Sequence, residues 1–114
     1  MLMTTQDEFA DYEIIQTLGV VRGNTIRARH IGNDILAGLR NLVGGEINEY
    51  TKMLAEAREQ SVDRMIEEAR RLQADGIVAV RFVTSPVMQG AAELLVYGTA
   101  VKTDKPEVII LGKL

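Results

Sequence analysis

The stretch from Gly45 to Thr84 constrains the fold more than any other part of the chain, because it predicts a long helix followed directly by a strand. Apolar residues recur at spacings of three and four, which places them on one face of a helix. These residues are Ile47, Tyr50, Leu54, Ala57, Met65, Ala69 and Leu72. The helix is expected to begin at Glu46 and to stop at Asp75-Gly76, because glycine suits the left-handed conformation of a helix cap.

The predicted length of this helix is unusual for so small a domain. A helix of about 29 residues would be about 43 Å long at 1.5 Å per residue. Part of it is therefore expected to pack on something outside its own sheet. Ser61 interrupts the run of good helix formers and marks a candidate bend.

Two segments after the helix predict a pair of strands. Gly76–Thr84 is rich in β-branched residues, and Ser85-Pro86 should end it because proline removes a donor from the ladder. Glu93–Lys102 is the next predicted strand. The two are expected to form an antiparallel hairpin, with a long loop through Met88-Gln89-Gly90.

The segment before the helix predicts shorter elements. Residues 12–26 indicate two strand pieces, with Gly19 as a bulge and Gly23-Asn24 as a turn. A short helix is expected over Ile35–Leu42, and Val108–Leu111 could add a short edge strand. The domain organisation that follows is a flexible tail over residues 1–11, a single α+β domain over residues 12–103, and a C-terminal tail over residues 104–114.

Composition excludes several classes of protein. At 114 residues the chain is long enough for one domain with its own core. It has no cysteine, which removes disulfides, thiolate zinc sites and cysteine nucleophiles. A net charge of −3 argues against nucleic-acid binding. The longest apolar runs fall short of the roughly 18 residues of a membrane span. The N-terminus lacks the pattern of a secretory signal, so a cytoplasmic location is expected by default.

The strands after the helix are apolar on both alternating faces. Residues 77–83 and Leu94–Tyr97 show this pattern. One long and one short helix can cover only one face of a small sheet, and monomers rarely expose a large apolar surface. The pattern therefore predicts that another copy of the chain covers the second face.

Candidate ligand-binding residues cluster before the helix. Arg27, Arg29, His30, Asp34 and Arg40 form this set, and guanidinium groups suit carboxylate or phosphate ligands. His30 and Asp34 are the candidate metal ligands, although a lone histidine is more often a hydrogen-bonded loop residue. The arginines could equally pair with helix acids across a subunit contact. No nucleophile or general base can be identified, so the chain is not expected to be an enzyme.

Several motifs resemble the YbjQ-like family, whose members carry a heavy-metal-binding label. The resemblance covers about Tyr12 to Lys102, and its residues are Gly19–Gly23, Ile26–Ile31, Ala37–Gly45, Tyr50, Ala57-Arg58, Ala79–Phe82 and Tyr97–Val101. It implies a β-α-β-β subunit of dodecin-like arrangement, assembled as a ring-shaped pentamer. It attaches no established enzymatic activity.

Two functions are therefore expected to compete. The first is an oligomeric binding protein for a metal ion or a small anionic ligand, with its site near subunit junctions. The second is a structural or partner-binding ring that holds no small ligand. A metal ion is the only cofactor that the resemblance suggests.

Overall fold

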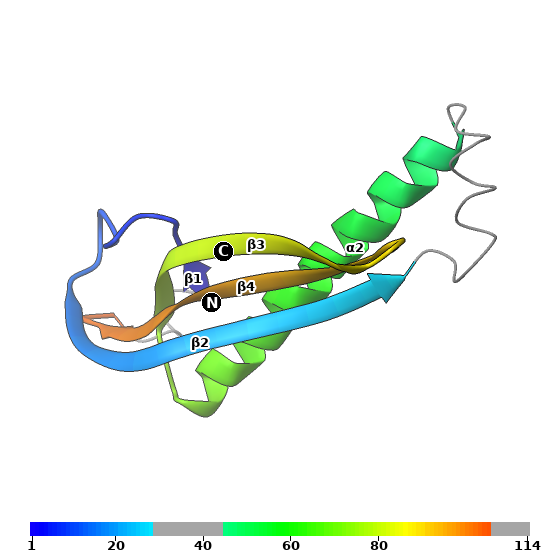
Figure 1. Ribbon diagram of the computed structural model, residues 1–114. Coiled ribbons are helices and arrows are strands. Elements are labelled where there is room, and N and C mark those ends of the chain that lie inside the picture. Colours follow the sequence, from blue (N-terminus) through cyan, green and yellow to red (C-terminus); the bar gives the residue numbers. More distant parts are fainter. Residues whose placement is uncertain (29–44, 106–114) are drawn as a thin grey trace.

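A four-stranded mixed sheet crossed by one long helix forms the fold in a computed structural model that describes residues 1–28 and 45–105 (Figure 1). The elements are β1 (Leu2–Met3), β2 (Ile14–Ala28), α2 (Gly45–Arg71), β3 (Gly76–Met88) and β4 (Ala91–Thr103). The strand order is β1-β3-β4-β2, with β1 parallel to β3 and the other pairs antiparallel. The α+β class is confirmed, although β1 makes the sheet mixed rather than purely antiparallel.

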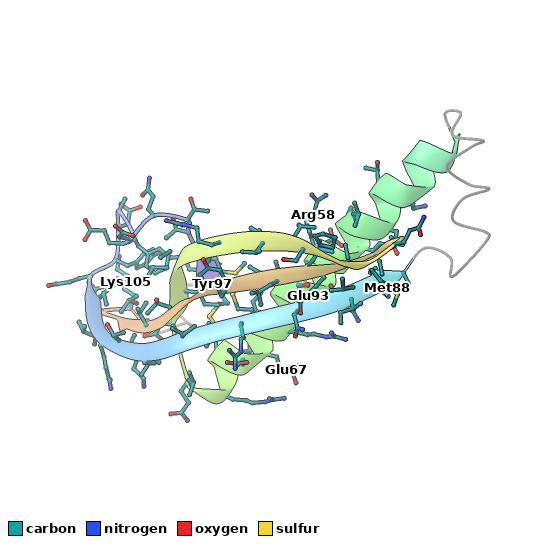
Figure 2. All side chains as sticks on the ribbon, viewed as in Figure 1. Arg58, Glu67, Met88, Glu93, Tyr97 and Lys105 are labelled. Atoms are coloured by element: carbon teal, nitrogen blue, oxygen red, sulfur yellow. The ribbon has the colours of Figure 1, made fainter. Side chains whose placement is uncertain are left out.

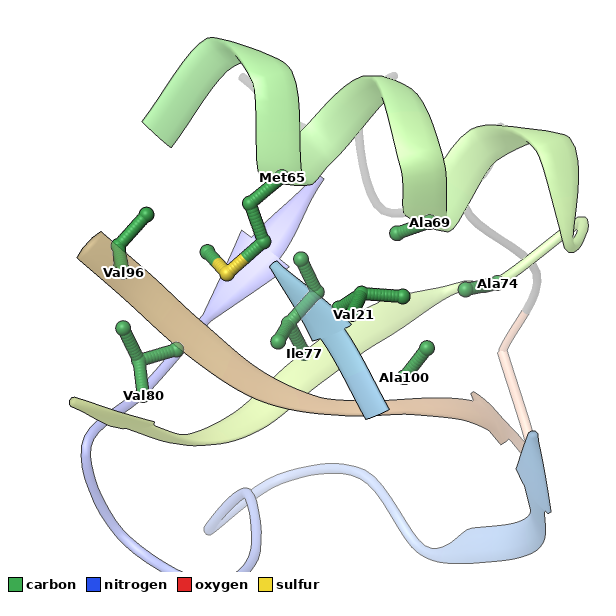
Figure 3. Close-up of a cluster of buried hydrophobic side chains, with 8 residues drawn as sticks. All are labelled: Val21, Met65, Ala69, Ala74, Ile77, Val80, Val96 and Ala100. Carbon is green, nitrogen blue, oxygen red and sulfur yellow. The ribbon is translucent and has the colours of Figure 1, made fainter. Parts of the chain in front are cut away.

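Helix α2 lies over β2 and β4, and the main core forms between them (Figure 3). Met65 and Ala69 project from the helix toward Val21, Ile77 and Val96, all fully buried. Figure 1 shows the N-terminal turns of α2 extending past the β3–β4 hairpin. The predicted long helix is confirmed at 27 residues, and its packing on something outside its own sheet remains a prediction. No described helix is long and apolar enough to cross a membrane.

Gly23 does not form a turn, and this corrects the prediction of two separate strand pieces. β2 runs without interruption for 15 residues, with the predicted bulge at Gly19. A Cβ atom at Gly23 would lie 2.0 Å from the carbonyl oxygen of Ser61 on α2. Glycine is therefore needed here for close contact between strand and helix rather than for a change of chain direction.

The helix ends four residues before the predicted stop. Gln73 adopts the left-handed conformation, with φ of 61°. The amide of Ala74 donates to the carbonyl of Ala69 at 3.1 Å, and the amide of Gln73 donates to that of Arg70 at 2.9 Å. This pair of bonds is a Schellman motif, with Ala69 and Ala74 buried together. Gly76 instead lies in β3, where a Cβ atom would meet the ring of Phe9 at 2.7 Å.

Strand β3 continues through Pro86, which corrects the predicted end at Ser85-Pro86. At Pro86, β3 pairs with β4 on one side and has no strand partner on the other among the described residues. Proline is tolerated on such an edge because its missing N–H is not needed there. Met88 pairs with Ala91, so the connection is a tight turn at Gln89-Gly90 rather than a long loop. The antiparallel hairpin itself is confirmed.

The N-terminal segment is structured, which corrects the prediction of a flexible tail over residues 1–11. Leu2 and Met3 pair with Gly76 and Ile77, and Phe9 is buried in a second apolar cluster. The amides of Ala79 and Val80 donate to carbonyls of this segment at 2.8 and 3.0 Å. Polar composition suggests fraying, but these backbone bonds and the Phe9 ring hold the segment on β3. The predicted Ile35–Leu42 helix and Val108–Leu111 strand lie outside the described residues.

Candidate functional site

Arg27 is the one predicted site residue within the part of the chain that the structure describes. It is the second-last residue of β2 and pairs in register with Ala92 of β4. Arg29, His30, Asp34 and Arg40 lie outside the described residues. The structure therefore places the start of the predicted cluster and leaves its assembly as a prediction.

The guanidinium of Arg27 is held between β2 and α2 with one donor unused. Its Nη2 donates to the side-chain oxygen of Gln60 on the helix. Its Nε is buried and has no hydrogen-bond partner within residues 1–28 and 45–105. An arginine stays charged at every physiological pH, and a buried donor without an acceptor is costly. This environment favours an anionic group beside Arg27.

The described residues do not fit a heavy-metal site. Residues 1–28 and 45–105 bring together no group of three or more histidine, cysteine or acidic side chains. The full chain has no cysteine and one histidine. Soft metals prefer thiolate and imidazole ligands, so the donor set of this chain suits them poorly.

A shallow groove runs along the side of α2 that faces β3, and sequence reasoning missed it. One part is lined by Arg58, Glu59, Val62, Asp63 and Phe82. The adjoining part shares Val62 and Phe82 and continues to Met3 and Val80. The groove exists because α2 lies mainly over β2 and β4. Ile77 and Val80 of β3 are still buried beneath the helix, but further along the same face Phe82 is 53% exposed. The alternating pattern of β3 did predict apolar residues on both faces, but not which would stay uncovered.

The outer face of the sheet carries apolar side chains between two arginines. Tyr97 of β4 pairs with Arg22 on one side and with Arg81 on the other. Val20 and Ile26 of β2 are 69% and 61% exposed. Figure 2 shows Tyr97 near the middle of the sheet and Met88 at the tip of the hairpin. The predicted second apolar face is therefore present in the single chain.

These features define a small α+β chain with exposed apolar side chains on its outer sheet face, an open groove beside α2 and a partly buried Arg27. The family model YbjQ_1, described as "Putative heavy-metal-binding", matches residues 1–104. The chain therefore belongs to this family, and the resemblance seen in the sequence is confirmed.

Relatives extend the match over nearly the full chain. A UPF0145 protein of Methanosarcina acetivorans is 58% identical, covering 90% of this chain and 96% of its own. A UPF0145 protein of Thermus thermophilus is 57% identical and covers 91% of each chain. A crystal structure of a DUF74-family protein of unknown function from Pediococcus pentosaceus has a TM-score of 0.60 at 22% identity. It covers 91% of this chain and 98% of its own, and it supports the fold alone.

Proposed function

We propose that this protein is a non-enzymatic, cytoplasmic ring of identical subunits, a pentamer, that binds a small anionic ligand through Arg27. The observation that carries the ligand class is the buried Nε of Arg27, which lacks an acceptor. A carboxylate or phosphate oxygen would supply that acceptor and compensate the charge. Arg29, His30, Asp34 and Arg40 follow closely in the chain and are the proposed remainder of the site.

A metal ion is the competing ligand class, because the family description names heavy metals. His30 and Asp34 are then the proposed ligands. The donor chemistry favours the anion, since one imidazole and one carboxylate make a weak site for a soft metal. The two ligand classes can be distinguished by substituting Arg27 and measuring whether the binding of an anion or of a metal ion changes.

The second candidate function is a structural ring that binds a protein partner and no small ligand. The exposed side chains of Val20, Ile26 and Tyr97 favour it, because apolar surface of this kind marks protein contacts. In that case Arg27 would pair with an acidic side chain of a neighbouring copy. An arginine paired in this way would not respond to added anions.

Native mass spectrometry on protein purified without a metal-affinity step is the first test. We expect a pentamer that retains a stoichiometric small mass. Isothermal titration would then compare inorganic phosphate with Zn²⁺ and Cd²⁺. Arg27→Gln should abolish phosphate binding, whereas Arg22→Gln, an equal change of charge on the exposed face of the same strand, should leave it unchanged.

Three results would contradict the proposal. A monomer under native conditions would contradict the proposed ring. Binding of Cd²⁺ that is lost in His30→Ala but kept in Arg27→Gln, with no phosphate binding, would replace the anion by a metal. A bare pentamer that titrates with none of these ligands would favour the structural alternative.

A further inference from the structure

The sheet has two open edges on opposite sides. β2 pairs with β4 along one side only, so its other side is unpaired over most of 15 residues. β3 is covered by β1 and residues 4–6 as far as Val80. From Arg81 to Met88, its outer side has no strand partner among the described residues. β4 is paired on both sides.

Exposed apolar side chains concentrate on these two edge strands. β2 carries Ile15, Val20 and Ile26, and β3 carries Phe82, Val83, Val87 and Met88, all more than 40% exposed. The central strand β4 contributes only Tyr97, at 38%. Stable monomers protect edge strands by making them short, bulged or charged, because open edges recruit further strands. Two long apolar edges on one subunit indicate that each meets another chain.

Charged side chains lie on both flanks of α2. On the flank over β2, the guanidinium of Arg64 donates to the carbonyl oxygen of Asn24 at 2.6 Å. On the flank facing β3, Glu59 and Asp63 line the groove together with Arg58 and Phe82. Arg64 on one side of the chain can therefore complement the two carboxylates on the opposite side, which outnumber the single arginine of the groove.

We propose that the open edge of β2 in one copy of the chain pairs with residues 81–88 of β3 in the next copy. The inference rests on the proposed oligomer and specifies its junction. Since β3 and β2 both run antiparallel to β4, they run parallel to each other, so a head-to-tail continuation of the sheet makes the new pairing parallel. Such a head-to-tail contact joins two different surfaces of the chain. It forms a closed ring when the rotation between neighbouring copies returns to the first copy after a whole number of copies.

The same arrangement accounts for the open groove. α2 of one copy lies over its own β2, so at the junction it also approaches the helix-side face of the adjacent β3. Phe82 and Val62 of the next copy then become covered. Arg64 then lies near Glu59 and Asp63 of that copy.

The alternative is a two-fold contact in which β2 pairs with β2 of a second copy. That contact would be antiparallel and would leave β3 and the groove open. It predicts cross-links between two copies of β2, with identical positions meeting only at the two-fold axis, whereas the head-to-tail junction predicts cross-links between β2 and β3. Because the sequence has no cysteine, any disulfide must form between the introduced cysteines.

Cysteine pairs test the junction directly. Ile26→Cys would be combined in turn with Val83→Cys, Ser85→Cys and Val87→Cys, in the full chain under mild oxidation. Ile26 pairs with Glu93, which pairs with Ser85, so β4 separates the two positions within one chain. Two strand spacings are roughly 9–10 Å, beyond the reach of a disulfide, which needs Cα atoms within about 7 Å. Intramolecular bridging therefore cannot mimic the result.

We expect at least one pair to give a ladder of covalent species beyond the dimer on a non-reducing gel, while each single-cysteine variant stays monomeric there. A wild-type ring in native mass spectrometry combined with no ladder from any pair would overturn the junction and leave the proposed oligomer standing. Dimers from Ile26→Cys alone would establish a two-fold contact with its axis close to Ile26 instead. A monomeric wild-type protein would overturn both proposals.

Charge reversal gives an independent readout. Arg64→Glu, and separately Glu59→Arg with Asp63→Arg, should each weaken assembly by about tenfold or more at low salt. Combining all three substitutions in one chain should restore it. Arg71→Glu, an equal reversal in the last turn of α2, serves as the control and should change assembly little. If both parent variants assemble poorly and the triple variant does not recover assembly, the charge pairing is contradicted.

Discussion

The hydroxyl oxygens of Thr25 and Ser61 lie 2.8 Å apart in the buried contact between β2 and α2. Both side chains reach the carbonyl oxygen of Ala57, and Ser61 also reaches that of Leu94 on β4. Thr25 is 3% exposed and Ser61 1%. A polar cluster thus joins one helix to two strands where an apolar core is expected, and it fixes the position of the helix along the sheet.

Ser61→Ala should lower the free energy of unfolding by about 1–3 kcal/mol, because it removes a donor to Leu94 and leaves buried polar groups less satisfied. Thr25→Ser keeps the hydroxyl and should cost less. Urea denaturation followed by circular dichroism measures both. Equal stability of Ser61→Ala and the wild type would show that the cluster contributes nothing to the fold.

Gly23→Ala should be among the most damaging single substitutions in the chain. The new methyl group would lie 2.0 Å from the carbonyl oxygen of Ser61, so the helix must move away from β2. Overpacking of this kind costs about 1–3 kcal/mol and occasionally more. Asn24→Ala, at the adjacent exposed position, is the control and should stay within about 0.5 kcal/mol. Thermal unfolding compares the two, and a small effect at Gly23 would contradict the close contact.

Gln73→Gly should stabilise the protein by about 0.5–1 kcal/mol. Gln73 holds a left-handed conformation that glycine adopts without strain. Arg71→Gly, at the last helical residue, should instead destabilise by about 1 kcal/mol, because glycine is a poor helix former. Opposite shifts in melting temperature for the two variants are the expected result, and a loss of stability in both would contradict it.

Val20→Asp should shift the proposed ring toward monomers, because it places a charge on the exposed face of the open edge strand. Val20 is 69% exposed in the single chain, so the fold itself should tolerate the change. Leu72→Asp makes the same kind of change at an exposed position beyond the end of α2 and should leave assembly intact. Sedimentation velocity distinguishes them, and equal sedimentation of both variants with the wild type would contradict a role for this strand in assembly.

The elements of the fold could be predicted from the sequence, but several of their junctions could not. Helical periodicity identified α2, and β-branched runs identified β3 and β4. Two glycines were interpreted wrongly, because a glycine needed for a turn and a glycine needed for close packing look alike in a sequence. Gly23 and Gly76 lack a side chain so that Ser61 and Phe9 can approach, not so that the backbone can turn. A close approach depends on a distant residue that no local pattern reveals.

The candidate site was only partly accessible to the same reasoning. Arg27 stood out by residue type, and the structure adds the buried Nε that makes it more than a surface charge. The groove at Val62 and Phe82 could not be predicted, because it depends on which strands the helix covers. The clustering of Arg29, His30, Asp34 and Arg40 remains a prediction.

The N-terminal residues on β3 bear on how neighbouring copies would align in the proposed ring. The chain from Leu2 to Gln6 occupies the first part of the β3 edge and leaves a defined stretch free from Arg81 onward. In the proposed ring, residues 2–6 would limit the part of β3 that a neighbouring copy can pair with. They would thereby affect the stagger between copies, and stagger sets the angle at which a sheet closes on itself.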